Sequence, residues 1–162
     1  MKAKDVIRNV VEFSHTVTRG YLEDLTDKEL FVRAVAGANH VAWQLGHLIG
    51  SEHQMLSAIG RSVPTLPAGF SEAHTKETAS SDDPAKFFKK SDYLSLMDKM
   101  KAASLAAIDT TPEGDLDKPA PESMRNYAPT IAAVLTLLGT HWLMHAGQFV
   151  PVRRKLGRPA MY

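Results

Sequence analysis

The sequence predicts an all-α protein, a four-helix bundle with one or two long crossover connections. Apolar residues recur at steps of three and four over segments of several turns, which is the period of an amphipathic helix. No segment shows the strict alternation that would indicate a convincing strand. Two connections are too long for a simple up-down-up-down bundle, so at least one must cross the length of the molecule.

The first helix is predicted from a stripe of apolar residues, and the second is predicted from the residues that cap and end it. The second helix is predicted to follow Asn39, a residue type that caps helix N-termini, and to end at Gly60. The first helix is predicted from one apolar stripe, formed by Val6, Val10, Phe13, Val17, Tyr21 and Leu25.

The last two helices have clearer ends. The third is predicted to be capped by Ser91 and to end near Pro112. The fourth is predicted to start at Thr130, directly after Pro129, and to end at Gly157. Between the second and third helices lies a connection of about thirty residues, rich in Pro, Ser, Thr and charge, and a linker of that length is usually functional or wraps the surface.

Composition narrows the class of protein. The chain has 162 residues, 44% of them hydrophobic and 23% charged, which suits one domain over residues 1–162. Its 19 basic and 18 acidic residues give a net charge of +1, so no electrostatic reason exists to expect nucleic acid as a partner. The sequence contains no cysteine, which excludes disulfides, thiolate metal ligands and a cysteine nucleophile. Any metal must be held by histidine or carboxylate, and thiol chemistry would need an external thiol.

Neither end of the chain reads as a targeting or membrane segment. Asp5, Arg8 and Glu12 interrupt the apolar residues at the N-terminus, so it lacks the core of a signal peptide. The apolar run after Thr130 is too short for a membrane span and contains His, Gln and Arg. The expectation is a cytoplasmic protein without a membrane partner.

Two histidines in that run are the main candidate functional residues. His141 and His145 are four residues apart, so on a helix their side chains lie on one face. Two imidazoles so placed can bind one metal ion, as in helices with His-x3-His spacing. The alternative is a pair of core histidines that are hydrogen-bonded to carbonyls or to a buried water. The spacing alone leaves both interpretations open.

A third ligand would have to come from a facing helix, and the second helix offers His47. Gly46 and Gly50 flank it, and small residues there allow another group to come close. Simple tight helix packing would explain the glycines equally well. Glu52 is interpreted as a salt-bridge residue in preference to a partner of the metal ligands. The other histidines, His15, His40, His53 and His74, are expected to be solvated or to have no special role.

Gln148 lies on the same side of the last helix as His141 and His145, because it follows them by seven and three residues. It is predicted to hydrogen-bond a ligand or to order a metal-bound water. The alternative is that its amide satisfies a buried backbone group.

These residues carry a resemblance to a known family. The segments WQLGHLIGSEHQML and HWLMHAGQFVPVRRKLGRP, with LPAGF and SDDPAKF between them, resemble the DinB-like superfamily of four-helix bundle proteins. The resemblance extends from the first helix to Pro159. It implies an up-down-down-up bundle in which His47, His141 and His145 bind one divalent metal, usually zinc or nickel, and it implies a homodimer. The name of the family refers to induction by DNA damage and implies no DNA binding.

The resemblance also implies candidate functions. Some members of the family are thiol S-transferases that use low-molecular-weight thiols. The leading hypothesis is therefore a metal-dependent transferase that activates an external thiol and acts on a small-molecule substrate. Three imidazoles leave an open coordination position, as catalytic metal sites do. The alternatives are a metal-dependent hydrolase and a non-enzymatic protein that binds a metal or ligand under stress.

Overall fold

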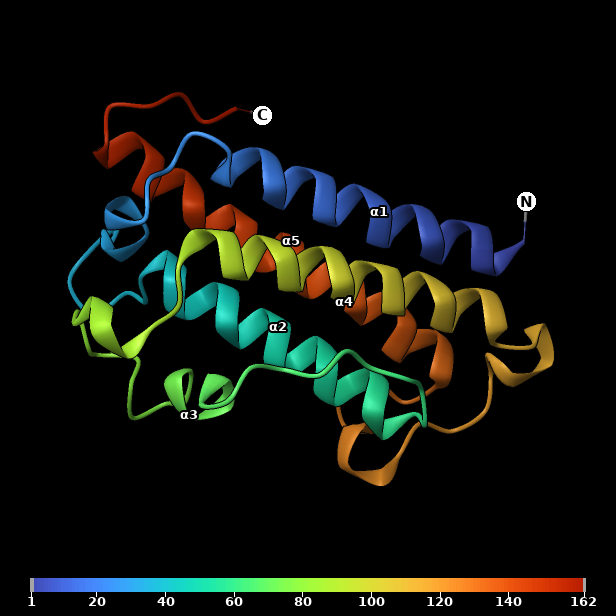
Figure 1. The fold of residues 1–162 in the computed structure, drawn as a ribbon. Helices are drawn as coiled ribbons and strands as arrows, with labels where there is room; N and C mark the ends of the chain where they lie inside the picture. Colours follow the sequence, from blue (N-terminus) through green and yellow to red (C-terminus); the bar gives the residue numbers. More distant parts are fainter. Residues whose placement is uncertain (1, 162) are drawn as a thin grey trace.

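The structure, a computed structural model, describes residues 2–161, and its framework is four long helices that lie side by side (Figure 1). They are α1 (Ala3–Leu22), α2 (Val41–Ala58), α4 (Lys90–Thr110) and α5 (Ile131–Lys155). The shorter elements are α3 (Phe70–Ala73) and four 3-10 turns, Lys28–Phe31, Pro84–Lys86, Glu113–Asp115 and Glu122–Met124. The described residues contain no strand, and one isolated bridge joins Pro119 to Thr130. The predicted all-α class is confirmed.

The helices follow the up-down-down-up order. In Figure 1, α1 and α5 run in one direction, and α2 and α4 run in the opposite direction. The helix α1 packs against α5 and α4, and α2 packs against the same two helices. The connection between α2 and α4 contains α3 and the Pro84–Lys86 turn and runs along the outside of the bundle. This long crossover makes α2 and α4 parallel, and it confirms the predicted topology.

Two predicted helix starts were wrong by one residue or more. His40, and not Asn39, caps α2: its Nδ1 accepts a hydrogen bond from the Trp43 backbone N–H at 3.0 Å. The other ring nitrogen, Nε2, lies 3.0 Å from the Ser81 carbonyl, so the ring is fixed from both sides. The helix α4 starts at Lys90 and not after Ser91, because the carboxylate of Asp92 accepts the backbone N–H of Lys89.

The predicted apolar stripe of α1 was also partly wrong. Val6 and Phe13 are 46% and 61% exposed, whereas Ser14 and Thr18 are buried. These hydroxyls turn inward at little cost because they donate to carbonyls one turn back, those of Val10 and Ser14. The buried face of α1 therefore lies beside the stripe that hydrophobicity alone indicates.

The close approach of α1 and α5 explains a glycine in the middle of α5. A Cβ atom at Gly139 would lie 3.0 Å from the backbone carbon of Val10 and 3.0 Å from Ser14 Oγ. Glycine lets the two backbones pack at this distance, although it lowers helix propensity. The core around this contact contains Leu135, Leu138 and Trp142, which fixes the rotation of α5 and hence the direction of its histidines.

Candidate metal centre

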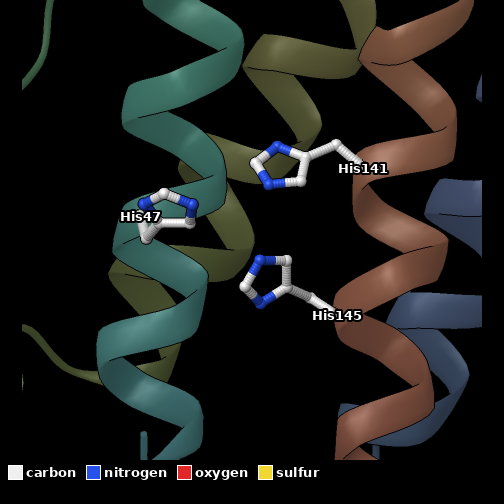
Figure 2. Close-up of side chains that lie close together, drawn as sticks. All are labelled: His47, His141 and His145. Carbon is white, nitrogen blue, oxygen red and sulfur yellow. The ribbon is translucent and has the colours of Figure 1, made fainter. Parts of the chain in front are cut away.

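Three half-buried histidines from two helices face one another between α2 and α5 (Figure 2). His47 comes from α2, and His141 and His145 come from successive turns of α5 (Figure 2). Each offers one ligand nitrogen, and these atoms all lie within 4.8 Å of one another. The ring centroids are 5.0 to 5.2 Å apart. The structure thus brings together the three residues that spacing and helix order single out.

The His145 ring is oriented by an amide. Its Nδ1 lies 2.9 Å from Gln44 Oε1, and Gln44 Nε2 donates to the Asn39 carbonyl at 2.8 Å. Because Asn39 O takes the amide N–H, the Gln44 oxygen faces the imidazole and Nδ1 carries the proton. The Nε2 lone pair of His145 is then the one available to a ligand. Gln44 is 2% exposed, so this orientation is protected from water.

Trp43 holds the plane of the His47 ring. The two rings are stacked, with centroids 5.2 Å apart and an interplanar angle of 5°. The indole is fixed in turn, because its Nε1–H donates to the Thr75 carbonyl at 2.8 Å. Trp43 and Gln44 precede His47 by four and three residues, so the helical period places both beside it. That spacing is a signal in the sequence, but it does not reveal which ring each side chain contacts.

Burial keeps the three imidazoles neutral. It lowers the pKa of His47 and of His141, and the neighbouring His47 lowers the pKa of His141 further. Burial, together with His141 and His47, lowers the pKa of His145 to about 4. Neutral rings are the form that binds a metal. At pH 7 the site therefore presents three uncharged nitrogen donors.

A buried polar cluster lies in the bundle next to this site, and each long helix contributes one residue. The Glu52 carboxylate accepts hydrogen bonds from Ser104 Oγ at 2.5 Å and from Trp142 Nε1 at 2.9 Å. His15 Nε2 lies 3.5 Å from the same carboxylate, and the His15 ring is 2% exposed. The hydrogen-bond donors to Glu52 are thus the uncharged Ser104 and Trp142, and its salt-bridge role stays a prediction. The expectation that His15 is solvated or unremarkable was wrong about its burial, because the ring is enclosed and lies with its centroid 4.8 Å from that of Trp142.

His74 also has a role that the sequence does not indicate. Its ring is 9% exposed, and it joins the Phe70 carbonyl to the Tyr93 hydroxyl through two contacts of 2.7 Å. A Cβ atom at Gly46 would overlap this ring. The group that packs against Gly46 is therefore the ring of His74, a histidine of the loop. No described atom lies within 4 Å of a Cβ built at Gly50.

The remaining predicted residues lie outside the group of three candidate ligands. Gln148 is exposed on α5, so its role toward a ligand stays a prediction. His53 is half-buried on α2, and His40 is fully buried as the cap of that helix. The expectation that His40 is solvated was wrong, because its partners, Ser81 and the Trp43 N–H, satisfy both ring nitrogens.

Two cavities of about 430 Å³ each lie beside His47. One extends between α2, α5 and the segment around the Glu122–Met124 turn, and it also reaches His141. The other is lined by α2 and α3 and includes His53 and His74. The two cavities share Ser51 and Gln54 in addition to His47. A small molecule in either one would touch the histidine group.

The donor set fits a divalent transition metal. Three imidazole nitrogens suit zinc, nickel, iron or copper, and ligands of a tetrahedral zinc ion lie about 3.3 Å apart. The ligand nitrogens of the three histidines lie within 4.8 Å of one another, so binding of one ion would require the rings to draw closer together. A helical bundle with three such histidines on two facing helices has the layout of a mononuclear metal site with an open position.

The chain belongs to the DinB superfamily, whose family model matches residues 11–149. The match includes all three histidines. A search of the curated proteins finds no match.

Two solved structures share this fold. A conserved protein of Enterococcus faecalis has a TM-score of 0.71 and 16% identity, with 98% of this chain and 99% of that chain covered. YfiT of Bacillus subtilis has a TM-score of 0.65 and 20% identity, over 96% of this chain and 88% of that chain. YfiT is described as a probable metal-dependent hydrolase with an unusual four-helix bundle topology. At these identities the likeness establishes the fold.

None of the helices in the described part of the chain combines the length and the apolar character that a membrane crossing requires.

Proposed function

We propose that His47, His141 and His145 hold one divalent metal ion, zinc or nickel, and that the protein transfers an external low-molecular-weight thiol to a small-molecule electrophile. The observation that carries the proposal is the group of three neutral imidazoles beside a cavity whose described lining contains no carboxylate or ammonium group. A metal held by three imidazoles keeps an open position and lowers the pKa of a thiol or water that binds there.

The absence of charged groups from that lining favours a thiol over water. A free thiol has a pKa of about 8.5, so a modest shift gives the thiolate at neutral pH without a general base. Glu52 is the buried acid near His141, and both of its oxygens accept hydrogen bonds. It is therefore engaged in the cluster and does not face a substrate. The chain itself has no cysteine that would compete as a ligand.

The test is thiol consumption. The protein loaded with zinc or nickel is mixed with a panel of cellular low-molecular-weight thiols and a model electrophile, and free thiol is followed over time. Consumption above that with the metal-free protein, and its loss in His141→Ala, is the expected result. If no thiol in the panel is consumed faster with the metal-loaded protein, transfer is excluded.

A second candidate, hydrolysis, is supported by the description of YfiT as a probable metal-dependent hydrolase. Here the nucleophile is water, and it must lose a proton without help from a carboxylate or an ammonium group in the described lining of the cavity. Release of nitrophenol from nitrophenyl esters in the absence of thiol distinguishes hydrolysis from thiol transfer. Metal-dependent release that added thiol does not change would favour the hydrolase.

We also propose a homodimer, as the family resemblance implies. The helix α1 supports it, because Val6 and Phe13 present apolar side chains to solvent at 46% and 61% exposure. Sedimentation analysis tests the assembly directly. A monomer at micromolar concentration would contradict it, and a Phe13→Lys variant is expected to shift a dimer toward monomer.

A further inference from the structure

The cavity between α2 and α5 is apolar next to the candidate metal ligands and open to solvent at its other side. Its lining contains the buried Met55 and Met124 and the partly buried Leu137, together with His47 and His141. Tyr127 and Met144 also line it, and they are 62% and 65% exposed. These two residues therefore form a rim through which a molecule can enter.

The described lining contains no Asp, Glu, Lys or Arg. Apart from a metal held by the histidines, an ionic group inside this cavity would lose its water shell without gaining an oppositely charged side chain, which is costly. Besides the two histidines, the polar side chains in the described lining are those of Ser51, Gln54, Ser123 and Tyr127. They can hydrogen-bond an uncharged polar substituent such as a nitro or carbonyl oxygen. The lining thus favours a neutral molecule with an apolar body.

Methionine makes this wall adaptable. Three of the seven methionines of the chain, Met55, Met124 and Met144, line the cavity. Their unbranched thioether side chains fit irregular shapes and make favourable contacts with aromatic rings. Its volume of about 430 Å³ falls at the small end of ligand sites, which suits one substituted ring or a short aliphatic compound.

The second cavity beside His47 has a different character. Its lining is largely polar or small, with Ser71, His53 and His74 among the residues, and it lies on the α3 side of α2. This cavity shares His47 with the apolar cavity, so a polar thiol placed in it would lie beside one of the three candidate ligands. Two reactants would then meet at the histidines from two directions.

We propose that the apolar cavity is the electrophile site of the enzyme and that it selects uncharged molecules with an aryl or alkyl body. The proposal rests on the thiol transfer proposed above. In the step, the thiol proton passes to solvent and the sulfur forms a bond to the electrophilic carbon. The bond from that carbon to the leaving group breaks, and the leaving group departs with the electron pair. No oxidant or reductant is needed.

Ligand binding tests the cavity without any turnover. The probe is phenylnaphthylamine, a neutral dye whose fluorescence rises in apolar surroundings, titrated into the metal-free protein. Met144→Lys places a charge at the rim, and Ala58→Phe adds bulk at an exposed position of the lining. Each is expected to weaken dye binding about tenfold. The controls are Val35→Lys, at a position 66% exposed, and Ser57→Phe, which is exposed next to Ala58 and outside the described lining.

Dye binding by Met144→Lys and Ala58→Phe at the affinity of the wild type would overturn the proposal. Loss of binding in the two controls as well would also overturn it, because the effect would then not belong to the cavity. Circular dichroism of each variant shows whether it is folded.

Selectivity provides the kinetic test. Chlorodinitrobenzene is neutral, and chlorodinitrobenzoate adds one carboxylate. After correction for their rates with thiol alone, the metal-loaded wild type is expected to prefer the neutral compound by about tenfold in kcat/KM. Met144→Lys is expected to narrow this preference, chiefly through KM of the carboxylate. Equal use of both compounds by the wild type would contradict an apolar electrophile site.

The two proposals fail in different ways. If neither compound consumes thiol but the dye binds and the variants weaken it, the cavity is a ligand site and thiol transfer is wrong. If thiol is consumed but the dye does not bind, thiol transfer stands and the electrophile site lies elsewhere.

Discussion

The orientation of the His145 ring shows how one residue prepares another for metal binding. Gln44 accepts from Nδ1 of this imidazole while its own N–H donates to Asn39 O, so the amide cannot rotate without losing one contact. The proton is held on Nδ1, and Nε2 keeps a free lone pair toward His47 and His141. Mutation of a residue that hydrogen-bonds a metal ligand commonly weakens metal affinity by about 10- to 100-fold.

We predict that Gln44→Met weakens zinc binding by about 10- to 100-fold with little change in fold, because methionine has a similar volume but accepts only weakly. Competition with a chromogenic chelator measures the dissociation constant. Gln148→Met, made in parallel, tests the amide that the sequence indicates. A loss confined to Gln148→Met would contradict the positioning role of Gln44.

At this scale the sequence could indicate the three histidines but not their partners. His141 and His145 are four residues apart, and His47 follows from the need for a ligand on a facing helix. The roles of His15, His40 and His74 depend on Glu52, Ser81 and Tyr93, which are distant in the sequence. Contacts of that kind are set by the packing of helices and loops, and no local pattern reports them.

Among the elements, α2 shows how a glycine allows a loop to pack closely against a helix. Gly46 lies against the ring of His74, whose two nitrogens are both engaged, whereas Gly50 faces open space one turn later. The sequence indicated that the glycines allow a close approach. It did not indicate that the approaching group is part of the long connection between α2 and α4.

Two substitutions separate the roles of these glycines. Gly46→Ala is expected to lower the free energy of unfolding by about 1–3 kcal/mol, because the methyl group would displace His74 from its hydrogen bonds. Gly50→Ala is expected to raise it by about 0.5–1 kcal/mol through helix propensity. Urea unfolding followed by circular dichroism measures both. Equal stabilisation by the two changes would show that His74 does not pack against Gly46.

The helix α1 illustrates where hydrophobic periodicity fails. The stripe through Val6 and Phe13 reads as a core face, but the residues that point inward include Ser14 and Thr18. Hydroxyls that donate to the helix's own carbonyls can be buried cheaply. The length and type of the helix could therefore be predicted, and its rotation about its own axis could not.

At the scale of the whole molecule, the crossover between α2 and α4 determines which helices face each other. It makes α2 and α4 parallel and places α2 beside α5, so His47 meets His141 and His145. The length of this connection was visible in the sequence and favoured a crossover. The up-down-down-up order itself came from the family resemblance, because a long linker permits either direction.

Buried histidines predict that stability decreases in acid. Burial lowers the pKa of His74 from 6.5 to about 4. The unfolded chain therefore binds the proton at a higher pH than the folded one. The contribution of the neutral His74 ring to the free energy of unfolding is fully present above pH 6.5. It is lost as the pH falls toward 4, and the loss is at most about 3 kcal/mol. The lowered pKa of His40 acts in the same direction.

Unfolding of the metal-free protein between pH 7 and 4 measures this loss. His74→Gln is expected to make the decrease less steep, because one of the buried histidines that take up a proton on unfolding is removed. His53→Gln, at a half-buried position of α2, serves as the control for the substitution of histidine by glutamine. A pH dependence that is the same in His74→Gln and in the wild type would contradict the assignment.

The most direct test of the metal centre is the metal content of matched histidine variants. The wild-type protein and each variant are dialysed against zinc or nickel with a weak competing chelator. Bound metal is then measured by inductively coupled plasma mass spectrometry. We expect one ion per chain in the wild type and in His53→Ala, and much less than one in His47→Ala, His141→Ala and His145→Ala. Retention of one ion per chain by all three variants would contradict the account.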